Sequence, residues 1–417
     1  MTSKAMTTAD AAAASVQPVD ASRRLASIDQ LRGLVMLLML LDHVRERFFL
    51  YRQVGDPLDI ATTDPGLAFT RLLAHLCAPT FVFLTGLSAY LYSQKHSQEQ
   101  LTRFLWQRGL VLIGLEVTLV NVAWLGSYQT LYLQVIWVLG LCMLLLALLR
   151  SLPRPLLWAI AVSLIGLHNL LTPIQFAASE WGYSLWTILH DRGYLVAKGE
   201  GAFAIKLSYP LLPWIGVIVL GYLAGPLFVT TATKRLRLLG YAGLGALLLL
   251  LILRSQNSYG ETLPWQWFSC VDGVVQALPQ VASVQQICWQ PTVLSWLNFT
   301  KYPPSLDFLL LTLGLMALLL RAFEQLASHR RFDALGQVLK DFGAAPMFFY
   351  LLHLYLLLLC YSVAEAFYGK THGDWFGVDA VWQLWLIAVL LAVVLYPATR
   401  WFAKYKQRSR HGWVKFL

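Results

Sequence analysis

The sequence predicts an all-α, polytopic membrane protein with about ten transmembrane helices and both termini in the cytoplasm. Three observations support this fold class. The composition is strongly apolar, with 58% hydrophobic and only 13% charged residues. Apolar segments of membrane-spanning length recur along the chain, and basic residues flank them on alternating sides. Such a composition excludes a soluble enzyme of this size.

Each apolar segment is long enough to cross a membrane, because a helix of about 20 residues spans the hydrocarbon core. The segments cover residues 31–51, 67–94, 104–124, 131–149, 155–173, 209–229, 236–254, 304–322, 343–368 and 378–402. We treat residues 23–402 as one transmembrane domain. Residues 1–22 lack the apolar core of a signal peptide and predict a disordered cytoplasmic tail. Residues 403–417 mix aromatic and basic side chains and predict an interfacial tail.

The basic residues predict the orientation. Most of the 32 Lys and Arg residues flank the segments on one side, and this side also holds both termini. By the positive-inside rule that side is the cytoplasm. The net charge of +10 then reflects topology and contact with anionic membrane lipid, and it does not indicate a nucleic-acid partner.

A first candidate site lies in the first predicted span, where Asp42 and His43 follow an apolar run from Leu34 to Leu41. Ionisable groups inside hydrocarbon are costly and mark a functional site by default. At ~1.5 Å per residue, His43 lies ~17 Å beyond Arg32 in a core ~30 Å thick. The alternative is that both residues solvate a helix end at the membrane boundary.

Polar residues on other spans are predicted at a similar depth, in the outer half of the membrane. They are Glu116, Asn121, His168, Asn169 and His75. A lone membrane histidine usually makes a helix–helix hydrogen bond. Several polar residues at one depth instead predict a polar cavity that opens outward.

Two helical stretches border this predicted cavity. Arg71 and His75 lie one turn apart on one face of the second span. Tyr350 and His353 point inward from the ninth span, either as a buried hydrogen-bonding pair or as catalytic residues.

A polar, proline-stiffened segment leads into the eighth span. It contains Asn298, Lys301, Tyr302, Ser305 and Asp307. Lys301 either meets an anionic substrate group or pairs with Asp307, and the sequence leaves this choice open.

Cysteine and histidine spacing bears on disulfides and metals. Cys270 and Cys288 are the two of the five cysteines that fall in a predicted outer loop. On an oxidising side they form either a disulfide or two free thiols. The histidines are scattered, and no Cys/His pair has ligand spacing, so we predict no metal and no bound cofactor.

Several motifs together resemble the bacterial branch of the heparan-alpha-glucosaminide N-acetyltransferase catalytic-domain family. They are Asp29 with Arg32-Gly33 and His43, Ala78-Pro79 to Gly86, Leu212-Pro213-Trp214, Thr300 to Ser305, and Pro346 to His353. The resemblance covers about residues 23 to 417. The spacing from Asp29 to His43 is also similar to that of the wider group of membrane sugar acyltransferases.

The resemblance implies transfer of an acyl group, typically acetyl from coenzyme A, to an amino or hydroxyl group of an extracytoplasmic sugar or glycan. It also implies a multi-pass protein of a bacterial-type inner membrane. Acetyl-CoA, or another acyl-CoA, would be a co-substrate, and the sequence leaves oligomerisation open. One departure is that no histidine lies between Arg52 and Gly66. Whether His43 or another histidine is the base therefore stays open, as does N- versus O-acylation.

Acyl transfer needs a base and a donor to the developing oxyanion. We expect His43 to be the base, since imidazole with a pKa of ~6.5 suits neutral pH. Asp42 or Glu116 would orient an imidazole. His75, Arg71 or Lys301 would stabilise the oxyanion or position the acceptor.

At the cytoplasmic end, Arg32 either binds coenzyme phosphates or simply pairs with Asp29. A rival hypothesis is a proton-coupled or solute transporter that uses Asp42, His43, Glu116 and His353 as a relay.

Overall fold

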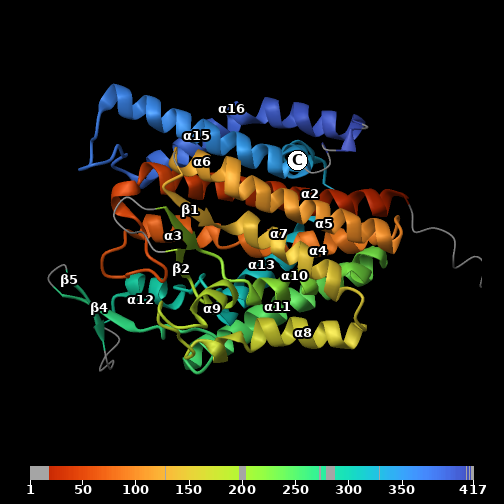
Figure 1. Ribbon diagram of the computed structural model, residues 1–417, viewed down its shortest axis with the longest axis horizontal. Helices are drawn as coiled ribbons and strands as arrows, with labels where there is room; N and C mark the ends of the chain where they lie inside the picture. Colours follow the sequence, from red (N-terminus) through yellow and green to blue (C-terminus); the bar gives the residue numbers. More distant parts are fainter. Residues whose placement is uncertain are drawn as a thin grey trace, which may run out of the picture.

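The computed structural model describes residues 18–126, 128–196, 203–271, 274–278, 287–327, 329–409, 411–412 and 414. Side chains are described from Ala26 onward, and most of the predicted N-terminal tail lies outside the described residues. The described chain is predominantly helical, with strands only in short connections (Figure 1).

Helices occupy all ten predicted spans. They are α2 (Pro18–Phe48), α3 and α4 (Pro65–Ala74 and Cys77–Ser93), α5 with α6 (Gln98–Leu115 and Asn121–Leu125), α7 (Val135–Leu149), α8 (Arg154–Gly166), α10 (Leu212–Leu223), α11 (Ala232–Gln256), α13 (Leu306–Leu326), α15 (Pro346–Tyr368) and α16 (Val381–Arg408). A π-helical turn, η2 (Glu116–Val120), joins α5 to α6, and a 3-10 turn, η4 (Gly225–Val229), extends α10.

Seven helical stretches of the described chain are long and apolar enough to span a membrane. Helices α7 and α8 are shorter apolar helices. These findings confirm an all-α, polytopic membrane protein. Helix α16 continues to Arg408, so residues 403–408 of the predicted interfacial tail belong to the last helix.

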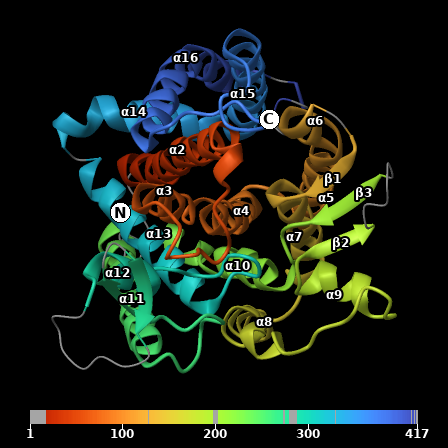
Figure 2. The ribbon, with the colours of Figure 1, turned by 90° about the vertical axis from the view of Figure 1, so that its left-hand side faces the viewer.

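Helix α2 lies at the centre of one half of the molecule, surrounded by α3, α4, α13, α14 (Asp333–Ala344), α15 and α16 (Figure 2). Glycines allow α14 to approach α2 closely. A Cβ on Gly33 would lie 1.8 Å from the carbonyl oxygen of Leu339, and one on Gly343 would lie 1.8 Å from that of Asp29. Any side chain at either glycine would therefore separate the two helices.

The outer connections contain structure that the sequence analysis did not predict. Strands β1 (Thr130–Leu133), β3 (Ala204–Leu207) and β2 (Gly193–Val196) form a sheet in that order, with β1 and β3 parallel. Strands β4 (Trp267–Val271) and β5 (Val274–Leu278) form an antiparallel hairpin. The short helices there are α9 (Tyr183–Leu189), α12 (Trp289–Trp296), η1 (Leu50–Arg52) and η3 (His168–Leu171). The remaining short turn, η6 (Arg330–Phe332), precedes α14.

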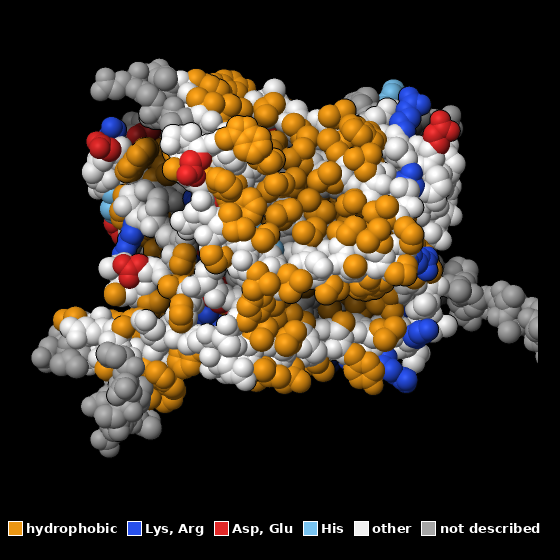
Figure 3. All heavy atoms as spheres, turned by 60° about the horizontal axis from the view of Figure 1, so that its bottom comes forward, with side chains coloured by type: hydrophobic (Ala, Val, Ile, Leu, Met, Phe, Trp, Pro, Cys, Tyr) orange, Lys and Arg blue, Asp and Glu red, His pale blue; other side chains and the backbone are white. Residues whose placement is uncertain are grey.

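The two ends of the molecule differ in charge. Strands β4 and β5 lie at the left-hand end in Figure 1, and α2 begins at the right-hand end. Lys and Arg side chains gather along the right-hand edge in Figure 3, beyond a broad apolar band. This distribution agrees with the positive-inside prediction, and we refer to the right-hand end as the predicted cytoplasmic side.

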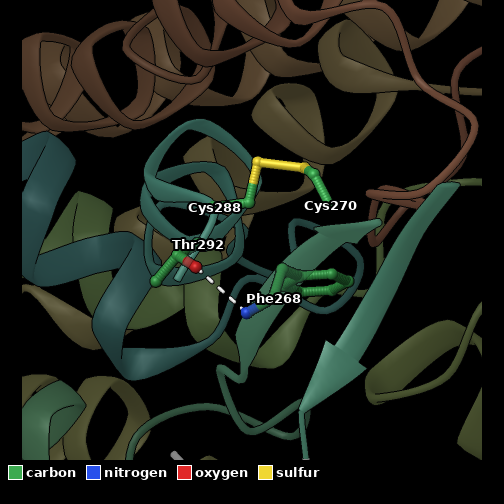
Figure 4. The surroundings of a disulfide bond; sticks show 4 residues. All are labelled: Phe268, Cys270, Cys288 and Thr292. Atoms are coloured by element: carbon green, nitrogen blue, oxygen red, sulfur yellow. Dashed lines mark hydrogen bonds between the residues drawn. A yellow bond between two sulfur atoms is a disulfide. The ribbon is translucent and has the colours of Figure 1, made fainter. Parts of the chain in front are cut away.

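Cys270 and Cys288 form a disulfide in the outer hairpin region (Figure 4). The bond links β4 to the residue that precedes α12. Two hydrogen bonds reinforce the link. The N–H of Cys288 donates to the carbonyl of Phe268 at 2.7 Å, and the N–H of Phe268 donates to Oγ1 of Thr292 at 3.0 Å.

Candidate active site

His43 of α2 and His353 of α15 form a hydrogen-bonded imidazole pair. Nδ1 of His43 lies 2.7 Å from Nε2 of His353, and Nδ1 of His353 lies 2.8 Å from the carbonyl oxygen of Phe349. Because a carbonyl only accepts, Nδ1 of neutral His353 carries the hydrogen and Nε2 accepts from His43. The lone pair of His43 therefore sits on Nε2, which has no hydrogen-bond donor among the described residues.

The two rings differ in access. His353 is fully buried, whereas His43 is partly exposed. Trp124 of α6 meets His43 edge-on, with ring centroids 4.8 Å apart, and the ring of Tyr350 lies 6.0 Å away. His43 is thus the accessible member of the pair, and the rings of Trp124 and Tyr350 flank it.

Neither predicted carboxylate orients His43. Oδ1 of Asp42 accepts from Nε of Arg45 at 3.0 Å and from Nη2 at 2.8 Å. Oε2 of Glu116 accepts from the backbone N–H of Trp137 at 3.1 Å, and so caps the first turn of α7. His353 therefore takes the orienting place that the sequence analysis gave to Asp42 or Glu116.

A cavity of about 250 Å³ lies between this pair and the predicted cytoplasmic side. Most of its wall is apolar, from α2, α4, α5, α7 and α15, and Thr85 and Ser88 add hydroxyl groups. Arg32, Arg108 and Lys406 also line it, and they are close enough to interact electrostatically. Tyr350 lines the cavity and also contacts His43. The cavity thus reaches from a group of cations to the neighbour of His43.

Arg32 has two partners within this wall. Its Nη1 donates to Oδ1 of Asp29 at 2.8 Å and to the carbonyl of Gly343 at 3.1 Å. The ion pair that the sequence suggested is therefore present, and Arg32 still faces the cavity. Asp29 orients the guanidinium and is not itself a lining residue.

The five polar residues that lead into the eighth span fall into two groups, and together with Arg71, Asp56 and His75 we call them the outer cluster. Asn298 exchanges two hydrogen bonds of 2.9 Å with the backbone of Leu58. Oγ of Ser305 caps α13 by accepting from the N–H of Phe308 at 3.1 Å, and it donates to Glu261 at 2.7 Å. The N–H of Asp307 donates to the carbonyl of Gly260 at 3.0 Å. These three residues hold loops in place, and none of the hydrogen bonds just described involves His43 or His353.

Lys301 and Tyr302 form the second group. The ammonium of Lys301 lies 5.2 Å from the ring centre of Tyr302, and no ion pair with Asp307 occurs among the described residues. Burial alone lowers the pKa of Lys301, but Tyr302 and Asp42 outweigh it and leave this pKa raised. Lys301 is therefore a cation, and Asp42 is close enough to interact with it.

Arg71 and His75 are placed apart from the predicted chemistry. Arg71 forms an ion pair of 2.8 Å with the buried Asp56, which also accepts from the N–H of Lys301 at 3.3 Å. His75 ends α3 and packs against Phe308, with ring centroids 5.0 Å apart. Neither ring nitrogen of His75 has a hydrogen-bond partner in the described part of the chain.

Several polar residues that were predicted to line an outward-opening cavity instead form hydrogen bonds with the backbone. Nε2 of His168 lies 2.7 Å from the carbonyl of Pro304. Asn169 accepts from the N–H of Leu306 at 3.0 Å. Asn121 accepts from the N–H of Tyr132 at 2.7 Å. These side chains hold the outer loops to the helices.

Sequence reasoning missed three residues of the site. Trp124 lies in an apolar stretch, where nothing distinguishes it from a packing residue. Arg108 and Lys406 were counted as basic flanks that report topology, although Arg108 lies inside the predicted span 104–124 and eleventh in the observed helix α5. Such a depth for a basic residue is the signal that could have identified it.

The fold and site define a multi-pass membrane protein with a hydrogen-bonded histidine pair near a cation-lined cavity. Residues 24–259 match the profile of the family described as "Heparan-alpha-glucosaminide N-acetyltransferase, catalytic". The chain belongs to this family, which is one of transmembrane acetyltransferases. The matched range includes His43 and Arg32, whereas Lys301 and His353 lie beyond it. No curated protein matched the sequence.

Proposed function

We propose that this protein transfers an acetyl group from acetyl-CoA to an amino or hydroxyl group of an extracytoplasmic sugar. The observation that carries the proposal is that Tyr350 lines the cation-rich cavity and also packs against His43. The membrane would be the inner membrane of a bacterial-type envelope. The family match supports the acyl-transfer chemistry, and the acceptor is our inference.

The cavity lined by Arg32, Arg108 and Lys406, which we call the donor cavity, suits coenzyme A as the acyl donor. Arg32, Arg108 and Lys406 would bind its phosphates, since guanidinium and ammonium groups are the usual phosphate ligands. The apolar wall would hold the pantetheine arm. Along α2, the rise from Arg32 to His43 is ~17 Å, a length that an extended pantetheine arm covers. The thioester would then lie beside Tyr350 and His43, with no long acyl chain to accommodate.

His43 would act as the general base. Its Nε2 lone pair takes the proton as the acceptor nitrogen or oxygen attacks the thioester carbonyl. The tetrahedral intermediate collapses, the C–S bond breaks, and the His43 imidazolium returns the proton to the departing thiolate. His353 is a positioning residue, because its Nε2 fixes the His43 tautomer and stabilises the imidazolium.

Trp124 and Tyr350 would supply oxyanion donors. Both rings touch His43, and each carries a hydrogen that can be donated. Donors that are already positioned for the developing charge cost no reorganisation during the reaction. Arg71 is a weaker candidate for this role, because Asp56 already neutralises its guanidinium.

The acceptor would approach from the outer side, where Lys301 and Tyr302 lie. An aromatic ring beside a cation offers a sugar both an apolar face and a hydrogen-bond donor. Glu46 lies one turn beyond His43 on α2, with a side chain that is 39% exposed. Its carboxylate would accept from the acceptor's amino or hydroxyl groups.

The direct test supplies acetyl-CoA and a panel of amino and hydroxy sugars to detergent-purified protein and measures release of coenzyme A thiol. We expect thiol release that depends on one class of acceptor. Protein that is folded but never consumes acetyl-CoA would contradict the proposal and favour the transporter hypothesis. The structure gives that hypothesis little support, since Asp42 and Glu116 are both held by other groups.

A further inference from the structure

A second cavity, of about 220 Å³, lies between the ends of several helices on the predicted cytoplasmic side. Arg150 follows α7, and Arg154 begins α8. Three aromatic side chains share the wall with them: Tyr90 of α4, Tyr222 of α10 and Trp158 of α8. This cavity shares no lining residue with the donor cavity, so it needs an explanation of its own.

The charges in this cavity are not neutralised by carboxylates. The two terminal nitrogens of Arg150 donate to neutral acceptors on α5, namely the carbonyl and side-chain oxygens of Gln98 and Oγ1 of Thr102. Its Nε has no hydrogen-bond partner in the described part of the chain. Arg154 is exposed, and no ion pair to it occurs among the described residues. No Asp or Glu is among the described residues that line the cavity.

The aromatic rings are held in fixed positions. Tyr90 and Tyr222 meet edge-on with ring centroids 5.6 Å apart. A Cβ at Gly225 would lie 2.0 Å from Cγ of Tyr90, so this ring rests directly on the backbone. Trp158 is 46% exposed beside the exposed apolar residues Leu156 and Val162 of α8. Tyr and Trp with Arg at a helix end are typical of the headgroup region of a bilayer.

We infer that this cavity binds the phosphate of an anionic phospholipid in the predicted cytoplasmic leaflet. Arg150 and Arg154 would bind the phosphate, and the aromatic rings would surround the glycerol. The acyl chains would lie along the exposed apolar face of α8. That face favours a membrane lipid over a free phosphate, and basic pockets between transmembrane helices are known to bind anionic headgroups.

The test is native mass spectrometry of the full-length protein in detergent, titrated separately with dioleoyl phosphatidylglycerol and dioleoyl phosphatidylcholine. We expect a retained phosphatidylglycerol adduct and little phosphatidylcholine. Arg154→Gln should weaken phosphatidylglycerol binding about fivefold, as expected for ~1 kcal/mol per basic residue near the headgroup. Arg150→Gln should have at least that effect, provided that its folded yield is normal.

Arg237→Gln is the matched control, because Arg237 is exposed at the same predicted side but does not line the cavity. It should bind phosphatidylglycerol as the unmodified protein does. Equal binding by Arg154→Gln and the unmodified protein would overturn the inference, as would equal retention of the two lipids. Inorganic phosphate at millimolar concentration should not displace the lipid, and full displacement would show a free-phosphate site instead.

Discussion

The donor cavity and the outer cluster both contain charged side chains, yet they are built in opposite ways. In the donor cavity, Arg108 and Lys406 line open space. In the outer cluster, Arg71 and Asp56 neutralise each other, and Ser305 and Asn298 hold backbone. An open cavity lined by three basic side chains, with Asp29 as their one acidic partner among the described interactions, suits an anionic ligand. A saturated cluster indicates loops fixed in position. In our proposal the acceptor would be met by Lys301, Tyr302 and Glu46.

The largest effect should come from the residue between the two sites. His43→Ala should fold and lose transfer by ~10²–10⁴-fold, the usual cost of removing a general base. The measurement is coenzyme A thiol release after the folded yield has been checked. Binding of acetyl-CoA should change little, because His43 does not line the donor cavity. Near-normal transfer by folded His43→Ala would show that another residue is the base.

His353 should show a smaller and more specific effect. His353→Leu removes the acceptor for Nδ1–H of His43, which frees the other tautomer, and we expect kcat to fall by ~10-fold or more. His353→Asn keeps an oxygen acceptor and should recover part of this loss. A merely structural role would lower the folded yield of both variants alike. Equal kcat values for the Leu and Asn variants would contradict the positioning role.

The donor cations should affect binding more than chemistry. Arg108→Gln and Lys406→Gln should each raise KM for acetyl-CoA by about tenfold, since a hydrogen bond to a charged group contributes ~1.5–3 kcal/mol. The kcat at saturating donor should stay near normal. Lys404→Gln is the control, because Lys404 is exposed on the same helix and does not line the cavity. An unchanged KM for acetyl-CoA in both cavity variants would show that coenzyme A does not bind in this cavity.

The disulfide should have the smallest effect on transfer. Cys288→Ser should abolish the mobility difference between reducing and non-reducing gels and destabilise the outer hairpin, where a disulfide typically contributes ~2–4 kcal/mol. Transfer should remain near normal, because β4 and β5 lie at one end of the molecule in Figure 1 and contribute no residue to the proposed site. Alkylation of both thiols in unreduced native protein would show that the bond does not form.

The sequence predicted the helical architecture well, because hydrophobic length and basic flanks are properties of single segments. It also selected His43 as a candidate, since a histidine after an apolar run is visible without any partner. Its partner was harder to find, because His353 lies 310 residues away and Asp42 is its chain neighbour. Lys406 was misread as an interfacial residue, because only packing of α16 beside α2 brings it to the cavity.

The strands of the outer loops were not predicted for a related reason. Strand β1 pairs with β3, so that Thr130 lies opposite Ala204. In the sequence, α7, α8, η3, α9 and β2 separate these two strands. Short strands of this kind depend on long-range pairing, and their local pattern is weak. Loops without a local strand pattern in the sequence can therefore still contain paired strands.

The central claim is that donor and acceptor reach His43 from opposite sides of the membrane. The direct measurement uses sealed proteoliposomes of known orientation, with impermeant acetyl-CoA on one side and the sugar identified in detergent on the other. We predict transfer when acetyl-CoA is on the side of Arg32 and Lys406 and the sugar is on the side of Lys301, and none with the two exchanged. Equal transfer in both arrangements, or transfer only when both substrates share one side, would contradict the account.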